Sequence, residues 1–287
     1  MKLKLRDVIW EFPARPLIMG IVNLVADSFS GDGVTDIDAA LARARQQVAD
    51  GAEIIDIGAE SARTNRGPIP EAEEAAQLRR FIERWPELRE NRPAGTSWPL
   101  LSINAWRPGV IREVLSHGGD LLNDIGGLPT DENARLCAET GAALLIMHTV
   151  GQPKVPHTHV GYDDIMARLE EFFAGKIALA ERAGVARDAI VLDPGIDFAK
   201  QRPDNLRIYR ELERLQKFER PILLPVSRKT VIGDVLDLPN AVERDAGTVA
   251  CIVQGMLRGA HIFRVHNVRA AAQTVRTIAA VTESGFE

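Results

Sequence analysis

The sequence has few aromatic residues, few cysteines and no long apolar run, and each shortage narrows the possible class of protein. Phe, Trp and Tyr together make up 5% of the 287 residues, which leaves an aliphatic core. The two cysteines, Cys137 and Cys251, lack the spacing of a metal site or a disulfide framework, so we expect reduced thiols in a cytoplasmic protein. No run of about 18 apolar residues, the length that spans a membrane, is present. The N-terminal segment MKLKLRDVIWEF lacks the apolar core of a secretory signal.

The charge pattern and the missing motifs argue against further classes of function. The net charge is −5 and no basic stripe stands out, so nucleic-acid binding is not expected. No G-x-G-x-x-G motif follows the first predicted strand, which argues against a dinucleotide site. No serine or cysteine carries the sequence signals of a covalent nucleophile.

Short apolar segments alternate with helix-like segments along the chain. Strands are predicted over 17–22, 53–58, 99–103, 120–125, 142–147, 189–192, 221–226 and 260–265. Helices are predicted over 37–50, 71–89, 107–117, 131–140, 163–183, 205–216, 240–258 and 268–281. Eight strands alternating with eight helices favour an α/β fold, a (β/α)₈ TIM barrel, and its usual size of about 250 residues fits one domain over 1–287. A hairpin over 3–12 precedes the first strand and is expected to plug the amino-terminal end of the barrel.

A polar residue stands at or just after the end of every predicted strand. These residues are Asn23, Asp56, Asn104, Asn123 with Asp124, His148, Asp193, Ser227 to Lys229, and Arg264 with His266. Taken singly, each has a structural explanation: an acid can cap a helix, and His148 is more typical of a buried histidine than of a base. Taken together they indicate a ligand, because the strand ends of a barrel converge on one rim and buried polar groups need partners.

The residue types at the strand ends fall into two chemical groups. Asn104, Asn123 and Asp193 are planar donors and acceptors that suit the edge of a flat heterocycle. A second group, Arg63, Arg264 and His266 with the amide Asn23, suits an anion such as a diphosphate held with Mg²⁺. Arg228 and Lys229 could bridge the two groups. A heterocycle beside a diphosphate indicates a reaction in which that diphosphate is displaced.

Several motifs together resemble the dihydropteroate synthase family along nearly the whole chain. The matching segments are IMGIVN at 18–23 with DSFS at 27–30, DIGAESAR at 56–63, LSIN at 101–104, LLNDIGG at 121–127, MH at 147–148, LDPGIDFAK at 192–200, PVSRKTVIG at 225–233 and RVHNV at 264–268. The SRK and RVH segments, combined with DPG-x-x-F at matching barrel positions, make the resemblance specific.

The resemblance implies a transferase of folate biosynthesis that joins p-aminobenzoate to 6-hydroxymethyl-7,8-dihydropterin diphosphate and releases diphosphate. Carried over by matching position, the pterin would be bound by Asn104, Asn123, Met147, Asp193 and Lys229. The diphosphate would be bound by Asn23, Arg63, Arg264 and His266, with Asn23 also a ligand of Mg²⁺, and p-aminobenzoate by Phe198, Ser227 and Arg228. The catalytic set would be Lys229, Asp193, Arg264 and His266. A homodimer is also implied.

The chain departs from the family pattern at three places. Val25 and Ala26 replace the usual Thr-Pro, Ala62 replaces a threonine, and Asn104 replaces the usual aspartate. Loss of a charged acceptor in a buried pocket costs about 1.5–3 kcal/mol of binding. A divergent relative that acts on another pterin or arylamine, or only binds a pterin, therefore stays open. So does a methyltransferase that uses a reduced methylpterin, although the SRK and RVH segments argue against it, since a methyl donor leaves no diphosphate to bind.

Overall fold

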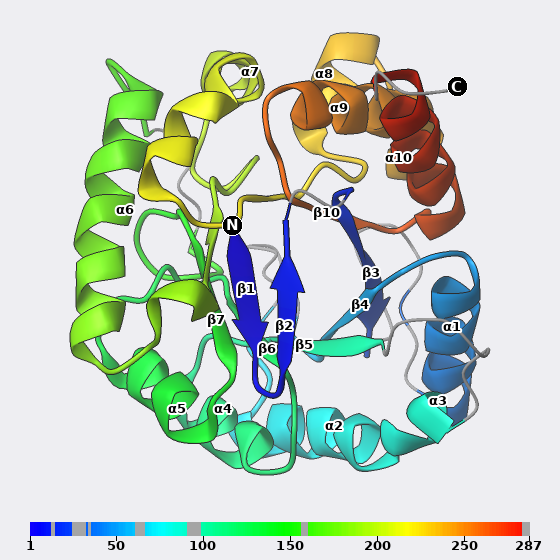
Figure 1. Cartoon of the computed structure of the whole chain (residues 1–287), viewed down its shortest axis with the longest axis vertical. Coiled ribbons are helices and arrows are strands. Elements are labelled where there is room, and N and C mark those ends of the chain that lie inside the picture. Colours follow the sequence, from blue (N-terminus) through cyan, green and yellow to red (C-terminus); the bar gives the residue numbers. More distant parts are fainter. Residues whose placement is uncertain are drawn as a thin grey trace.

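Eight parallel strands form one closed barrel surrounded by helices (Figure 1). The computed structural model describes residues 1–12, 15–24, 33, 36–60, 67–90, 99–155 and 160–282. The barrel strands are β3 (Leu17–Asn23), β4 (Ile54–Gly58), β5 (Leu100–Asn104), β6 (Leu121–Asp124), β7 (Ala143–Met147), β8 (Ile190–Asp193), β9 (Leu223–Leu224) and β10 (Ile262–Val265). Their spatial order is β8-β7-β6-β5-β4-β3-β10-β9, and a single bridge between Leu192 and Ile222 closes the ring. The predicted (β/α)₈ fold is confirmed.

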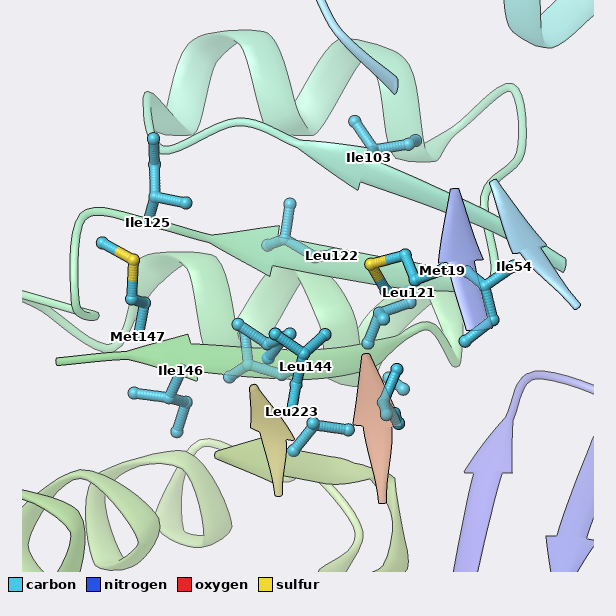
Figure 2. Packing of buried hydrophobic residues seen from close by; sticks show 14 of the residues in the cluster. Met19, Ile54, Ile103, Leu121, Leu122, Ile125, Leu144, Ile146, Met147 and Leu223 are labelled. Carbon is cyan, nitrogen blue, oxygen red and sulfur yellow. The ribbon is translucent and has the colours of Figure 1, made fainter. Parts of the chain in front are cut away.

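The strands form because their residues are apolar on both faces. In β3 every residue from Leu17 to Val22 is buried, the pattern of a parallel strand with side chains packed on each side. Neighbouring strands pair in register, with Met19 opposite Ile54 and Ile54 opposite Leu100. Figure 2 shows how apolar side chains fill both faces of these strands. The core is therefore continuous from the barrel interior to the helices outside.

The helices follow the predicted pattern with a few differences. They are α1 (Ile37–Ala49), α2 (Glu71–Arg84), α3 (Pro86–Glu90), α4 (Pro108–Leu115), α5 (Glu132–Thr140), α6 (Ile165–Arg182), α7 (Arg202–Glu211), α8 (Thr230–Leu236), α9 (Asp245–Leu257) and α10 (Val268–Thr282), with short 3₁₀ turns η1 (Arg187–Ala189), η2 (Leu212–Phe218) and η3 (Ala241–Arg244). The predicted helix 71–89 is divided at Trp85, because Pro86 has no N–H to continue the ladder. Helix α8 was not predicted.

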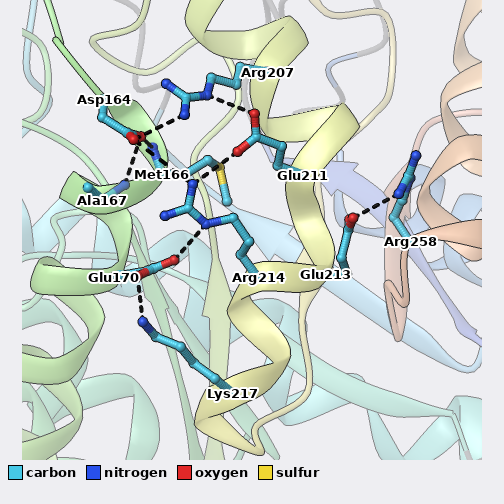
Figure 3. Close-up of polar contacts among 10 residues, drawn as sticks. All are labelled: Asp164, Met166, Ala167, Glu170, Arg207, Glu211, Glu213, Arg214, Lys217 and Arg258. Atoms are coloured by element: carbon cyan, nitrogen blue, oxygen red, sulfur yellow. Dashed lines mark hydrogen bonds and ion pairs between the residues drawn. The ribbon is translucent and has the colours of Figure 1, made fainter.

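Helix α7 begins three residues earlier than predicted, and a capping box explains its start. Gln201 and Asp204 exchange side-chain and backbone hydrogen bonds around its first turn. Ion pairs then join α7 and η2 to α6, as Figure 3 shows. Arg207 pairs with Asp164 at 3.0 Å, and Arg214 pairs with Glu170 at 2.8 Å. Exposed pairs of this kind each contribute little, so apolar packing remains the main force that holds the outer ring.

The predicted hairpin is present and lies across the amino-terminal end of the barrel, in front of the strands in Figure 1. It consists of β1 (Lys2–Leu5) and β2 (Val8–Glu11), and Leu3 and Leu5 are fully buried. At its turn the Arg6 guanidinium donates to four backbone carbonyl oxygens just before β6 and β7: Thr140 at 2.8 Å, Leu115 at 3.0 Å, Gly118 at 3.4 Å, and Gly119. One side chain thus attaches the hairpin to two αβ connections.

Within the described ranges, no helix combines the length and the apolar character needed to cross a membrane.

Replacing Arg6 tests the attachment of the hairpin. We expect Arg6→Ala to lower the free energy of unfolding by about 2 kcal/mol, because several carbonyl groups lose a charged donor. Urea denaturation measures the change. Arg258→Ala, which removes an exposed pair with Glu213, is the control and should change stability by less than about 0.5 kcal/mol. Equal effects of the two substitutions would contradict the role given to Arg6.

Candidate functional site

The polar residues predicted from the strand ends lie at the carboxyl end of the barrel, opposite the hairpin. Asn23, Asn104, Met147 and Asp193 are the last residues of β3, β5, β7 and β8, respectively. Asn123 and Arg264 lie one residue before the ends of β6 and β10. Ser227, Arg228 and Lys229 occupy the loop between β9 and α8, and His266 follows β10. Parallel strands bring these positions to one rim.

Asp56, in the middle of β4, is the hub of a buried polar network. Its side chain has no exposure to water. The Ser102 hydroxyl donates to its Oδ1 at 2.6 Å, the Asn123 amide donates to both oxygens at 3.2 and 3.3 Å, and Arg264 Nε donates to its Oδ2 at 2.7 Å. One carboxylate therefore connects β4, β5, β6 and β10. Asp56 was expected at a strand end, but it lies at the centre of β4. The sequence signal for its role was a single charge in an apolar strand.

The network determines how Asn123 can meet a ligand. Its NH₂ group is committed to Asp56, and its Oδ1 atom is buried without a hydrogen-bond partner among the described residues. A buried acceptor without a donor is unfavourable, and native proteins rarely leave one unmatched. Asn123 Oδ1 is thus an acceptor prepared for an N–H or O–H group of a ligand.

Asp193 supplies a second acceptor close to several cations. Its Oδ1 accepts a hydrogen bond from the Gly195 N–H at 2.7 Å. Burial raises the pKa of Asp193 to about 6, and the charges of Lys229, Lys200 and Arg264 oppose that rise. Because Arg264 also pairs with Asp56, the heterocycle-type residues and the anion-type residues share one electrostatic environment.

Lys229 lies between the loops that follow β8 and β9. Its ammonium donates to the Ile196 carbonyl at 2.8 Å and lies 5.1 Å from the centre of the Phe198 ring. Burial lowers the pKa of Lys229, while Asp197 and Asp193 oppose that change. Lys229 thus joins the two loops, and its place between the two chemical groups stays a prediction.

The loop between β9 and α8 is held by residues from the start of α9. Arg228 pairs with Asp245 at 2.7 Å and has a left-handed backbone with φ of 56°. Arg244 donates to the carbonyl groups of Arg228 and Lys229 at 3.1 and 3.2 Å. Ser227 Oγ lies 2.8 Å from His266 Nδ1, which joins this loop to the end of β10. The unusual backbone of Arg228 is thus supported by contacts on several sides.

Two of the predicted amides flank Gly58 at the end of β4. Asn23 and Asn104 are both opposite Gly58 in the strand register, and both are partly exposed. No hydrogen bond joins the side chain of Asn104 to the parts of the chain that the structure describes. Arg63 and the substituted positions Val25, Ala26 and Ala62 lie outside the described residues.

The arrangement offers two kinds of binding group at one rim. Asn123 on β6 and Asp193 on β8 present acceptors, and Lys229 presents a donor from the loop after β9. Arg264 and His266 present cationic or donor groups on β10 and just beyond it. Such a site can hold a polar ring and stabilise negative charge on a group that leaves from it.

Comparisons with known proteins agree with this arrangement. A family model described as "pterin binding enzyme" matches residues 19–266. Dihydropteroate synthase of Escherichia coli is 34% identical over 93% of this chain and 92% of its own length. A solved structure of Xanthomonas albilineans dihydropteroate synthase with 4-aminobenzoic acid is 30% identical, covers 99% of both chains and superposes with a TM-score of 0.86. The mitochondrial folate synthesis bifunctional protein of Arabidopsis thaliana is 34% identical over 96% of this chain, which spans 51% of that relative.

Asp56→Asn tests the hub. We expect it to lower the free energy of unfolding by about 3 kcal/mol, because the partly buried Arg264 loses its ionic partner. Ser102→Ala removes one neutral donor from the same carboxylate and should cost about 1 kcal/mol. Urea denaturation compares the two variants. Similar losses for both would show that the charge of Asp56 is not what matters.

The raised pKa of Asp193 predicts a pH dependence of stability. The folded protein keeps a proton that the unfolded chain loses between pH 4 and about 6, so Asp193 favours the folded state at low pH and this contribution fades as the pH rises. The pKa shift of Asp193 corresponds to a change of about 3 kcal/mol in the free energy of unfolding. Unfolding free energies of the wild type and Asp193→Asn, measured from pH 4 to 7, should therefore diverge. Parallel curves would contradict the assignment.

Proposed function

The chain belongs to the pterin binding enzyme family, and from this premise we propose that it is a dihydropteroate synthase. The proposed reaction joins p-aminobenzoate to 6-hydroxymethyl-7,8-dihydropterin diphosphate and releases diphosphate. The observation that carries the proposal is the Asp56 network, which joins the ring-binding Asn123 to the cation Arg264 through one carboxylate. The binding of 4-aminobenzoic acid by the Xanthomonas relative supports the choice of arylamine.

The pterin ring is proposed to lie against β5 to β8. Asn123 Oδ1 and the Asp193 carboxylate would accept hydrogen bonds from its N–H groups, and Lys229 would donate to its carbonyl oxygen or a ring nitrogen. Met147, buried at the end of β7 and opposite Asp193 in the register, would contact the ring face. Asn104 would contact the same ring from β5.

The diphosphate is proposed to lie near β3 and β10, where Asn23, Arg264 and His266 meet the rim and to which Arg63 would contribute. Among the described residues, no group of three or more His, Cys, Asp or Glu side chains could hold a metal ion. The Asn23 amide offers one oxygen, and Mg²⁺ is commonly held by few protein ligands together with substrate phosphates and water. Asn23 would therefore hold Mg²⁺ together with the diphosphate, and the bound ion would neutralise part of the diphosphate charge.

In the proposed reaction the amine nitrogen attacks the methylene carbon attached to the pterin, and the bond from that carbon to the diphosphate oxygen breaks. Diphosphate leaves with the bonding electrons, and the amine loses a proton. Arg264 and His266 would stabilise the charge on the departing group, while Asp193 and Lys229 keep the ring in place. The acceleration is thus electrostatic and positional, without a covalent enzyme intermediate.

The arylamine is proposed to lie near the loops after β8 and β9. Phe198 would contact its ring, and Ser227 and Arg228 would contact its carboxylate. Arg228 already pairs with Asp245, which limits the directions that its guanidinium can take.

Asn104 favours a second candidate function, a divergent relative that acts on another pterin or arylamine or only binds a pterin. A neutral amide at the end of β5 replaces the family's aspartate, beside Asn123 in the strand register. It offers both a donor and an acceptor and carries no charge that could stabilise a cationic pterin.

Diphosphate release from the two substrates and Mg²⁺ tests the proposal. We expect turnover by the wild type, and a gain of about tenfold in kcat/KM for Asn104→Asp, because a charged acceptor strengthens binding of a developing cation. Turnover by the variant alone would favour the divergent relative. Pterin binding without turnover by either protein would show a binding protein, and binding that does not depend on the diphosphate would favour the methyltransferase.

The homodimer and the cytoplasmic location stay predictions. The chain spans about half the length of the bifunctional Arabidopsis relative, and the activity proposed here concerns the residues that match.

A further inference from the structure

The loop between β8 and α7 has no regular secondary structure, yet its own Lys200 and the side chains of Tyr162 and Lys229 hold most of its carbonyl groups. The carbonyl oxygens of Gly195 and Phe198 accept from Lys200, that of Ile196 accepts from Lys229, and that of Ala199 accepts from Tyr162. Gly195, Asp197 and Ala199 all have left-handed backbones, with φ between 50° and 69°. Such a conformation is unfavourable for Asp197 and Ala199, so the contacts must maintain it.

Lys200 is the buried member of this set, and nothing in the proposed reaction uses it. It is 8% exposed. Its ammonium lies 2.9 Å from the carbonyl oxygens of Gly195 and Phe198, 2.9 Å from His148 Nδ1 and 3.3 Å from the His148 carbonyl oxygen. Burial lowers the pKa of Lys200 to about 7, and the charges of Asp193 and Asp197 oppose that change. The acceptors around Nζ match its N–H donors, which a buried amine requires.

His148 is the fixed point to which the ammonium attaches the loop. It follows β7 directly and is fully buried, and its ring packs edge-on against Phe172 at 4.7 Å. Burial and the nearby Lys200 charge lower the pKa of His148 to about 2, so the ring is neutral and Nδ1 can accept. A Cβ added at Gly195 would lie 2.0 Å from the His148 carbonyl oxygen, which shows how closely the loop approaches this strand end.

The contacts of Lys200 with the loop, called the clamp below, act on Phe198, the residue that the proposed function places against the arylamine. Lys200 holds the carbonyl group of Phe198 directly, and the Phe198 ring lies beside Lys229. Asn123 and Asp193, two of the proposed pterin ligands, have their backbones fixed by the ladders of β6 and β8. The Asp193 side chain and Lys229 also contact this loop, through the Gly195 N–H and the Ile196 carbonyl group, whereas the side chain of Asn123 is held by Asp56.

We propose that Lys200 is a positioning residue for the arylamine site: its ammonium clamps the loop over 195–198 to His148 and thereby sets the place of Phe198. The proposal rests on the function proposed above. The proposal separates the two substrates, because loss of the clamp should displace Phe198, which Lys200 holds directly, more than the pterin ligands on β6 and β8.

Lys200→Met keeps the length of the side chain and removes its donors, and Lys176→Met is the matched control. Lys176 also donates to a loop carbonyl, that of Leu128 at 2.6 Å, but in the loop between β6 and α5. We expect Lys200→Met to raise KM for p-aminobenzoate about tenfold and to change the Kd of the pterin diphosphate less than about threefold. Amide hydrogen exchange over 195–200 should become faster in this variant only.

An unchanged KM for p-aminobenzoate, or an equal loss of pterin binding, would overturn the proposal, because a general loss of stability lowers the active fraction without separating the substrates. If Lys200→Met does not fold, Tyr162→Phe replaces it: loss of the bond to Ala199 should raise the same KM about threefold, and no rise overturns the proposal. If the wild type does not turn over, the proposed function fails, and hydrogen exchange alone then decides whether Lys200 clamps the loop.

Discussion

A carboxylate that is removed from water must keep its donors, and Asp56 takes its donors from three other strands of the barrel. This requirement constrains the rest of the site. Asn123 must present its oxygen because its NH₂ group faces Asp56, and Arg264 must hold its guanidinium beside β4 because Asp56 is its counter-ion. The carboxylate thus organises an acceptor for a ring and a cation for an anion at the same time.

A second buried acid, Asp193, is likewise compensated by nearby cations. Asp193 is buried at the end of β8, where Lys229, Lys200 and Arg264 make its ionised form less unfavourable. Two of these cations also hold the loop after β8 through carbonyl groups. Positive charge near the strand ends therefore supports both the acid and the backbone around it, which allows several ionisable groups to share a rim without large exposure to water.

Local patterns in the sequence were sufficient to predict the barrel, since the strands are mostly apolar on both faces and a polar residue lies near the end of each. They were not sufficient for features that depend on distant partners. Helix α8 begins at Thr230, and the N–H groups of Thr230 and Val231 donate to Asp197, 33 residues before Thr230. The residue that caps α8 is therefore distant in the sequence. The role of Asp56 was missed for the same reason, because its donors lie on strands far away in the sequence. The buried position of Lys200 was equally invisible before the fold was known.

The closure of the barrel has a mechanical consequence. Strands β3 and β4 share five paired positions, whereas β8 and β9 meet at one bridge between Leu192 and Ile222. Asp193 ends β8 beside this narrow seam, and Lys229 lies in the loop after β9. The loops that follow β8 and β9 are joined by the Lys229 contact with Ile196 and the Asp197 contacts with α8. Side chains thus provide the cross-links that the backbone ladder lacks there. The joint between the first and last parts of the barrel therefore depends on side-chain contacts at the place where the two proposed substrates would meet.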